Sequence, residues 1–280
     1  MNQPPTLAFL ADTQAPMWIE ALFLKQRNNV KATQAIFRDI LQRHPETLYW
    51  LGDVVVLGYK NSAWPLVDTF LTNCEEAGIT VRAIMGNHDV MGRPKKGQRN
   101  FQRRFPDHVP TGYAHVTDGV GVVLLNSNFS TLTLEQQQEQ QTFYENTLNA
   151  YNNDPTIRAI IVTTHYAPYS NSRLVGSSKP VQQRFVEPYL ASAKAKLFIT
   201  GHAHAYEKFV VRGKTFLVIG GGGGLKQPLH TPPKYDDQAL TYKPMFHYLT
   251  VRREDEALHV QSHCLTDDQK GVEDGYGFVV

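Results

Sequence analysis

Cysteines, long apolar runs and an excess of charge of one sign are all lacking or scarce in this chain of 280 residues. The two cysteines, Cys74 and Cys264, follow no metal-binding or redox spacing, so we expect free thiols. No run of about eighteen apolar residues is present, so we expect no membrane-spanning helix. The start of the chain lacks the positive and apolar regions of a signal peptide, and we expect a cytoplasmic protein.

The charge balance is close to neutral, with 28 lysines and arginines against 26 aspartates and glutamates. This balance argues against a general binder of nucleic acid or of membrane surfaces. Hydrophobic residues make up 41% of the sequence, which is enough for a substantial core. The sequence shows neither an internal repeat nor a clear linker, so residues 1–280 are predicted to form a single domain.

Short apolar runs of strand length recur through the first two thirds of the chain. They are rich in valine, isoleucine and leucine and mostly continuous, which is typical of strands buried on both faces. The runs cover residues 7–11, 47–52, 81–85, 120–125, 159–163 and 197–200. Between them, helical patterns cover residues 31–43 and residues 182–195, the second interrupted near Pro188. The glutamine-rich residues 135–141 suit a helix with a polar face.

The remaining elements are predicted to be β-hairpins. The predicted strand pairs are 113–117 with 120–125, 208–211 with 215–219, and 246–252 with 257–265. Asp118-Gly119, between the first two strands, is a strong signal for a two-residue turn. Alternating strands and helices followed by hairpins predict an α/β fold with mixed sheets covered by helices.

Polar residues at the ends of the apolar runs are the most informative feature. In open α/β sheets, ligands bind beyond the carboxyl ends of the strands, so side chains at several strand ends converge. A single aspartate there is usually a cap or turn residue, but five such ends with carboxylate, amide or imidazole groups are hard to explain as caps. These groups are Asp12, Asp53, Asn87-His88-Asp89, His165 and His202-Ala203-His204.

Together these motifs resemble the signature of the calcineurin-like metallophosphoesterases, in the order found in that family. The motifs are Asp12-Thr13-Gln14, Gly52-Asp53, Gly86-Asn87-His88-Asp89, His165 and Gly201-His202-Ala203-His204. The resemblance implies a four-layer α/β/β/α sandwich with two mixed β-sheets and a dinuclear metal centre. It covers about residues 7 to 225 of the chain.

The resemblance also implies roles by position. One metal ion is held by Asp12, Gln14, Asp53 and His204, and the other by Asp53, Asn87, His165 and His202. Asp53 bridges the two cations, which need a shared anion because they lie only ~3.5–4 Å apart. A bridging hydroxide, formed near neutral pH, attacks phosphorus. His88 protonates the departing alkoxide as a general acid, and Asp89 orients His88.

Gln14 departs from the family pattern, which usually has histidine at that position. Purple acid phosphatases also lack this histidine, but they have a tyrosine three residues after the bridging aspartate, where this chain has Val56. Gln14 instead resembles the Mn-dependent ADP-ribose and CDP-alcohol diphosphatases. Its amide oxygen favours Mn over Zn at this site if it binds metal; the alternative is that water fills the position. The whole donor set suits Mn or Fe, and Zn is also compatible.

Several residues near the motifs are candidates for substrate binding. They are Arg99 and Arg103 in a basic run after His88, and Tyr166, Tyr169 and Arg173 after His165. The basic run either clamps a second phosphate or forms a solvated surface, and the tyrosines either line the pocket or pack under their loop. The glycines at 220–224 either bring backbone close to the metals or only turn the chain.

These features predict a metal-dependent phosphoric ester hydrolase with a small phosphorylated substrate. Gln14 and the basic run favour small phosphodiesters or nucleotide-type diphosphates, and a phosphomonoesterase similar to acid phosphatases is the alternative. A non-catalytic binding scaffold on the same fold is a second alternative, against which the retained Asn87, His88 and histidine ligands argue. A nuclease is a third, against which the near-neutral charge argues.

Overall fold

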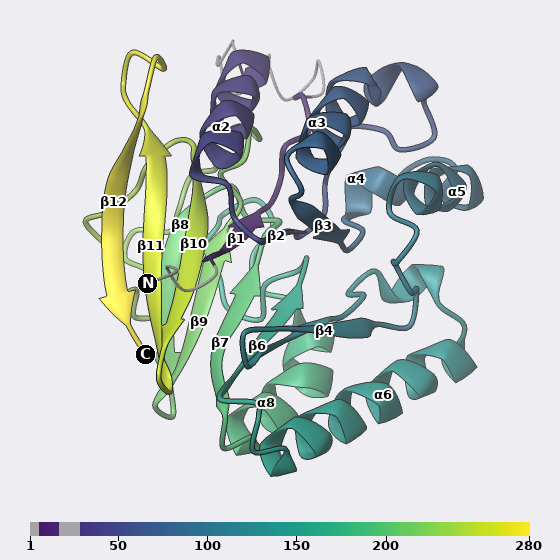
Figure 1. The fold of residues 1–280 in the computed structure, drawn as a ribbon, viewed down its shortest axis with the longest axis vertical. Coiled ribbons are helices and arrows are strands. Elements are labelled where there is room, and N and C mark those ends of the chain that lie inside the picture. Colours follow the sequence, from purple (N-terminus) through teal and green to yellow (C-terminus); the bar gives the residue numbers. More distant parts are fainter. Residues whose placement is uncertain (1–5, 17–28) are drawn as a thin grey trace.

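The computed structural model describes residues 6–16 and 29–280. Within these residues, two β-sheets of six strands each pack face to face, and helices cover their outer faces (Figure 1). The layers therefore run α/β/β/α, as predicted. The first five residues, on which the absence of a signal peptide was argued, lie outside the described residues. No helix in the described part of the chain is long and apolar enough to cross a membrane.

The first sheet combines strands from both ends of the chain. In spatial order its strands are β12 (Val272–Val279), β11 (Ala257–Leu265), β10 (His247–Glu254), β1 (Thr6–Leu10), β2 (Thr47–Trp50) and β3 (Thr80–Ala83). Strands β1, β2 and β3 are parallel, with Leu7 opposite Thr47, whereas β10 runs antiparallel to β1. The carboxyl ends of β1, β2 and β3 therefore share one edge of the sheet.

The second sheet is built from the middle of the chain. In spatial order its strands are β4 (Tyr113–Thr117), β5 (Val120–Leu124), β6 (Ala159–Thr164), β7 (Ala195–Thr200), β9 (Lys214–Ile219) and β8 (Tyr206–Val211). Strands β5, β6, β7 and β9 are parallel, and β4 and β8 are antiparallel strands at the two edges. The three predicted hairpins, β4–β5, β8–β9 and β10–β11, are confirmed.

Helices and short helical turns connect the strands. They are α2 (Asn29–Arg43), η1 (Asn61–Ala63), α3 (Pro65–Glu76), α4 (Asn87–Val90), α5 (Pro94–Arg104), η2 (Phe129–Thr131), α6 (Leu134–Asn153), α7 (Lys179–Val181), η3 (Gln182–Val186) and α8 (Glu187–Ala191). Figure 1 shows α2 and α3 on one side of the molecule and α6 and α8 on the other. The helix predicted over residues 182–195 is instead a continuous stretch over residues 179–191. Pro188 does not interrupt it, because it lies in the first turn of α8, next to the π-helical η3.

Strand β1 shows why the apolar runs are continuous. Leu7 and Phe9 point into the core between the two sheets, whereas Ala8 and Leu10 pack toward α2 and α3. The central strands of the second sheet do the same, with Ile161 between the sheets and Val162 toward α6 and α8. Because both faces of these strands are buried, both sets of alternating positions must be apolar.

Candidate metal centre

The seven predicted metal ligands lie just beyond strand ends of both sheets. Asp12 and Gln14 follow β1, Asp53 follows β2, Asn87 begins α4 after β3, His165 follows β6, and His202 and His204 follow β7. Asn87 and His202 are partly buried and the other five are buried. The first sheet thus supplies carboxylate and amide groups and the second supplies imidazoles, and the two sets meet at one end of the sandwich.

Three of these residues have a left-handed backbone conformation, with φ angles of 59° at Asp12, 49° at Asp53 and 68° at His202. Residues other than glycine rarely adopt this conformation, and such strain concentrates at functional sites. Backbone hydrogen bonds fix both carboxylates. The His202 N–H donates to Asp12 Oδ2 and the His88 N–H donates to Asp53 Oδ1, each at 2.8 Å. The second oxygen of each carboxylate is left to face the centre.

The first group of converging atoms surrounds His204. Its Nδ1–H donates to the carbonyl oxygen of Leu225 at 2.8 Å, so a neutral ring presents the lone pair of Nε2 to the centre. Asp12 Oδ1 lies 3.5 Å from this nitrogen. The amide of Gln14 lies 3.2 Å away, with its oxygen toward His204 when its NH₂ donates to the carbonyls of Asp12 (3.2 Å) and Asp53 (3.0 Å). The opposite orientation would set the amide oxygen against those two carbonyl oxygens.

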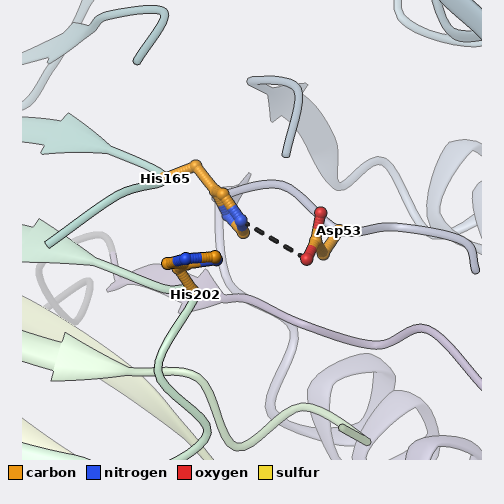
Figure 2. A group of neighbouring side chains, drawn as sticks. All are labelled: Asp53, His165 and His202. Atoms are coloured by element: carbon orange, nitrogen blue, oxygen red, sulfur yellow. Dashed lines mark ion pairs between the residues drawn. The ribbon is translucent and has the colours of Figure 1, made fainter. Parts of the chain in front are cut away.

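The second group surrounds His165 in the same way. Its Nδ1–H donates to the carbonyl oxygen of Leu51 at 2.9 Å, which leaves Nε2 facing the centre. Nε2 lies 3.2 Å from Asn87 Oδ1 and 3.4 Å from Asp53 Oδ2. Figure 2 shows His165, His202 and Asp53 pointing toward one another, and their potential ligand atoms lie within 4.8 Å of one another.

Each group therefore brings an imidazole nitrogen, a carboxylate oxygen and an amide oxygen together as acceptors. Acceptors at such distances repel one another unless a proton or a cation lies between them. Within the described residues, Asp12 Oδ1 is buried without any hydrogen-bond donor. The nitrogen and oxygen donors fit divalent cations such as Mn, Fe or Zn. The residues present thus fit two neighbouring metal positions, with Asp53 between them.

Where no cation lies between the acceptors, protonation of one group would relieve the repulsion, and the pKa values indicate which group that is. Burial alone would lower the pKa of His165, but the Asp53 carboxylate outweighs it and raises that pKa to about 9. Burial would raise the pKa of Asp53, but His165 and the other histidines lower it overall. Burial and the neighbouring His165 lower the pKa of His202 to about 3. Without metal, a proton on His165 thus balances the carboxylate.

His88 is placed beside the metal positions without belonging to either group. Its Nδ1–H donates to the carbonyl oxygen of Val56 at 3.1 Å. Its Nε2 lies 3.9 Å from Asp53 Oδ2, so this nitrogen faces the centre. The side chain is buried apart from 8% of its surface. A histidine held in this way can donate a proton to a group bound at the centre.

The predicted orientation of His88 by Asp89 is wrong. The Asp89 carboxylate accepts backbone N–H groups of Val54 (3.1 Å), Val55 (3.2 Å) and Gly86 (2.8 Å). It therefore fastens the loop after β2 to the loop after β3, and the Val56 carbonyl fixes the ring of His88 instead. Burial and the nearby Asp53 raise the pKa of Asp89 to about 7.

The five glycines that follow β9 bring backbone against the centre. A Cβ atom on Gly224 would lie 2.4 Å from His204 Cε1, and one on Gly220 would lie 3.0 Å from Asp12 Oδ2. The Gly224 N–H donates to the carbonyl oxygen of Asp12 at 2.7 Å. Of the two interpretations of this segment, close approach to the centre is therefore confirmed. Side chains here would displace the neighbouring ring and carboxylate.

The substrate-binding candidates lie in different surroundings. Tyr166 packs edge-on against His202, with ring centroids 4.4 Å apart, so it borders the centre. Tyr169 packs against Phe216 and Tyr235 at 5.0 and 5.4 Å, so the packing interpretation holds for this residue. Arg99 and Arg103 are exposed on α5, and Arg173 is exposed in the loop after β6. Among the described residues, none of these three arginines forms an ion pair with an acidic side chain.

One polar segment beside the centre was not predicted. The turn Asn126-Ser127-Asn128 follows β5 and is buried next to the end of β6. The signal was available in the sequence, because these residues follow an apolar run just as the predicted ligands do. Asparagine and serine are such common turn residues that the pattern alone did not distinguish them.

Comparisons with known proteins agree with this geometry. The calcineurin-like phosphoesterase family model matches residues 5–206. No curated protein matches the chain in sequence. A purple acid phosphatase from yellow lupin seeds has a similar fold, with a TM-score of 0.73 at 16% identity over 100% of this chain. The chain covers 54% of the lupin chain, and so spans about half of its length.

Two further solved structures share the fold. A dimetal phosphatase from Danio rerio has a TM-score of 0.61 at 12% identity, covering 97% of this chain and 99% of that one. GAP50, described as the anchor in the inner membrane complex of Plasmodium, has a TM-score of 0.66 at 12% identity, covering 98% and 87%. At these identities the similarity shows the fold alone. The family model covers more than half of the sequence, and the chain belongs to the calcineurin-like phosphoesterase family.

Proposed function

We propose that this chain is a hydrolase of phosphate esters that depends on two metal ions. The observation that carries the proposal is the pair of acceptor groups around His165 and His204. In each, an imidazole with Nδ1 bound to a carbonyl turns Nε2 toward a carboxylate oxygen and an amide oxygen. Membership of the phosphoesterase family supports the same reaction class.

The ligand sets of the two metal ions follow from these groups. Asp12, Gln14, Asp53 and His204 would hold the first ion, and Asp53, Asn87, His165 and His202 the second. When bound, two such cations polarise phosphoryl oxygens and provide a nucleophile from water near neutral pH. The mixed nitrogen and oxygen donors, with the Gln14 amide at the first position, favour Mn or Fe over Zn.

His88 is proposed as the general acid. Its Nδ1–H is bound to the Val56 carbonyl, so the proton available to a leaving group is the one on Nε2. The ring is buried beside Asp53, which both proposed ligand sets share, and it is not itself in an acceptor group. A proton donated from Nε2 would neutralise the alkoxide that departs when the bond from phosphorus to oxygen breaks.

A basic cluster supports a substrate with a second anionic group. The antiparallel bridge between Ser172 and Leu229 places Arg173 and His230 on the same face of the paired segments. Asn171 Oδ1 accepts the Lys234 N–H at 2.8 Å, which brings Lys234 to the same place. The pKa of His230 is lowered by partial burial and by the positive charges of Lys234 and Arg173.

The backbone segment that carries this basic cluster is hydrogen-bonded to the side of the centre that holds His204. Ser172 Oγ donates to Gln227 Oε1, and the Gln227 N–H donates to the carbonyl oxygen of His204 at 3.1 Å. Together with exposed Arg99 and Arg103 on α5, these cations favour small phosphodiesters or nucleotide-type diphosphates over simple monoesters.

A panel of three substrates tests the proposed function. We expect the Mn-loaded protein to hydrolyse a bis-nitrophenyl diester or a CDP-alcohol with a higher kcat/KM than a nitrophenyl monoester. Arg173→Ala should raise KM for the CDP-alcohol and leave the monoester unchanged. Arg212→Ala is the matched control, because that exposed arginine pairs with Glu187 elsewhere.

Two outcomes would contradict the proposal at different levels. If the monoester has the highest kcat/KM, the proposed substrate class is wrong. If the metal-loaded protein hydrolyses none of the esters, the proposed hydrolase activity itself is wrong.

A further inference from the structure

The turn Asn126-Ser127-Asn128 is bonded to two loops that carry proposed metal ligands. Asn128 Nδ2 donates to the carbonyl oxygen of Met85 at 2.7 Å, two residues before Asn87. Ser127 Oγ accepts the Tyr166 N–H at 2.9 Å, directly after His165. Met85 belongs to the segment after β3 in the first sheet, and Tyr166 to the segment after β6 in the second. One buried turn thus links the two sheets at the centre.

The turn is itself held by several hydrogen bonds. The Asn128 N–H donates to Asn126 Oδ1 at 2.8 Å, and Asn126 Nδ2 donates to the carbonyl oxygen of Pro110 at 3.1 Å. Gln140 of α6 makes two bonds to the backbone of Asn126, accepting its N–H at 2.8 Å and donating to its carbonyl at 2.9 Å. Because Gln140 bonds both the N–H and the C=O of one residue, it fixes the position of Asn126 relative to α6.

Gln140 is the residue through which the glutamine-rich helix bonds the turn. The predicted polar-faced helix is confirmed as α6, yet Leu134 is 82% exposed whereas Gln140 is completely buried. A buried glutamine lowers stability unless all its polar atoms are bonded. Both polar atoms of the Gln140 side chain form hydrogen bonds with the backbone of Asn126. Helix α6 is therefore connected to the metal centre by way of the turn.

We infer that Ser127 and Asn128, anchored by Gln140, are positioning residues that set the distance between Asn87 and His165 for the second metal ion. These two ligands are 78 residues apart in sequence, yet Asn87 Oδ1 lies 3.2 Å from His165 Nε2. Neither Ser127 nor Asn128 bonds a proposed ligand atom; Ser127 bonds the backbone N–H directly after His165, and Asn128 bonds the backbone carbonyl two residues before Asn87. The first metal position has no such link to the turn among the described residues, so the effect is confined to the second.

This inference rests on the proposed dinuclear centre, and Mn(II) binding tests the two separately. In a His204→Ala background, only the second position keeps its imidazole ligands. There, Asn128→Leu, which keeps the branched side-chain shape but has no hydrogen-bond donor, should weaken Mn(II) binding by about 10- to 100-fold. In a His165→Ala background, which retains the first position, Asn128→Leu should leave Mn(II) binding unchanged. Ser127→Ala should act like Asn128→Leu, and Ser127→Thr, which keeps the hydroxyl, should restore binding.

Two glutamines of α6 provide a matched pair of control variants. Gln140→Leu should weaken the second position, because it releases Asn126. Gln137→Leu should not, because Gln137 Nε2 donates to the carbonyls of Phe129 and Leu132, which are not bonded to a ligand loop. With two Mn(II) per chain, electron paramagnetic resonance should show coupled ions in Gln137→Leu and a mononuclear signal in Asn128→Leu. Excess Mn(II) should restore kcat in Asn128→Leu, which a general loss of folding would not allow.

The possible results separate the inference from the proposed function. Wild-type protein that binds no Mn(II) would contradict both. Wild-type protein that binds two ions, with Asn128→Leu, Ser127→Ala and Gln140→Leu all binding two ions equally tightly, would overturn the inference alone. Equal weakening of both metal positions by these variants would also overturn it, because the turn would then stabilise the fold rather than position one pair of ligands.

Discussion

The tautomers of His165 and His204 determine whether the centre can hold metal ions. Each ring donates its Nδ1–H to a backbone carbonyl, so each must bind a cation through Nε2. Such bonds to the second nitrogen fix ring orientation and increase the basicity of the ligand. The accepting carbonyls belong to Leu51 and Leu225, whose side chains have no group that binds metal or transfers a proton.

Metal binding should release protons and strengthen as pH rises. The Asp53 carboxylate, against the opposing effect of burial, raises the pKa of His165 to about 9. At neutral pH the metal-free ring is therefore protonated, and the cation must displace this proton. Apparent affinity for Mn(II) should increase with pH until it approaches the pKa of His165 and level off above it. Calorimetry in buffers of different ionisation enthalpy measures the release, and binding without proton release at neutral pH would contradict the proposed ligand role of His165.

Replacing His88 should separate metal binding from proton donation. Because His88 lies outside both acceptor groups, His88→Ala should keep both metal ions. Its kcat should fall by about 10²-fold or more for esters with poor leaving groups. With nitrophenyl esters the loss should be smaller, because nitrophenolate departs without protonation. Steady-state kinetics on both ester types, with metal content measured beside them, makes the comparison. An equal loss on both would argue against a general acid.

Single residues differ in how far the sequence determines their roles. Asp12, Asp53 and His165 could be identified because each ends an apolar run, and the carboxyl ends of parallel strands meet. The role of Asp89 could not, because it depends on which backbone N–H groups the loops turn toward its carboxylate. The same holds for Asn128, whose partner Met85 is 43 residues away in the sequence.

Among the elements, the glycine segment after β9 is the most sensitive part of the centre. Gly224→Ala would place a Cβ atom 2.4 Å from the ring of His204, so the ring must move from the Leu225 carbonyl. We expect binding at the first metal position to weaken by about 10- to 100-fold, with the second retained. Gly271→Ala is the control, since its nearest contact would be an ordinary 3.8 Å. Metal titration of both variants measures this, and unchanged binding in Gly224→Ala would refute the close approach.

Strands with two apolar faces were predictable, whereas α5 and β12, which have few apolar residues, were not. The buried strands of both sheets follow from their continuous valine, isoleucine and leucine runs. Helix α5 could not be predicted from such a pattern, because Phe101 is the one large apolar side chain that it buries, beside Gly97 and Asn100. Strand β12 contains Gly275, Gly277 and two acidic residues, a composition with low strand propensity, and pairing with β11 overrides it.

At the scale of the whole molecule, the centre lies where the two sheets meet. Asp12, Asp53 and Asn87 come from the first sheet, and His165, His202 and His204 from the second. Spacing along the sequence does not reveal this division, because nothing in the apolar runs marks that the chain passes from the first sheet to the second after β3. The sandwich with helices as its outer layers was implied by the family resemblance, whereas which helices cover which sheet required the structure.

Metal ions shared between the sheets should stabilise the whole fold. A ligand that binds only the native state stabilises it by about 2.7 kcal/mol at a concentration 100 times its Kd. Mn(II) should therefore raise Tm, and a chelator should lower it. In His165→Ala, which removes a ligand of the second sheet, the increase should be smaller. Calorimetry with and without Mn(II) measures the shift, and a Tm that is independent of Mn(II) would contradict binding between the sheets.

The central claim is that two metal ions bind side by side at Asp53, one beside His204 and one beside His165. Anomalous scattering from crystals of the protein grown with Mn(II) tests it most directly. The account predicts two anomalous peaks ~3.5–4 Å apart, with the Asp53 carboxylate between them. Nε2 of His204 should be a ligand of one ion, and Nε2 of His165 a ligand of the other. No peak within ~2.5 Å of the Asp53 carboxylate, in crystals saturated with Mn(II), would contradict the account.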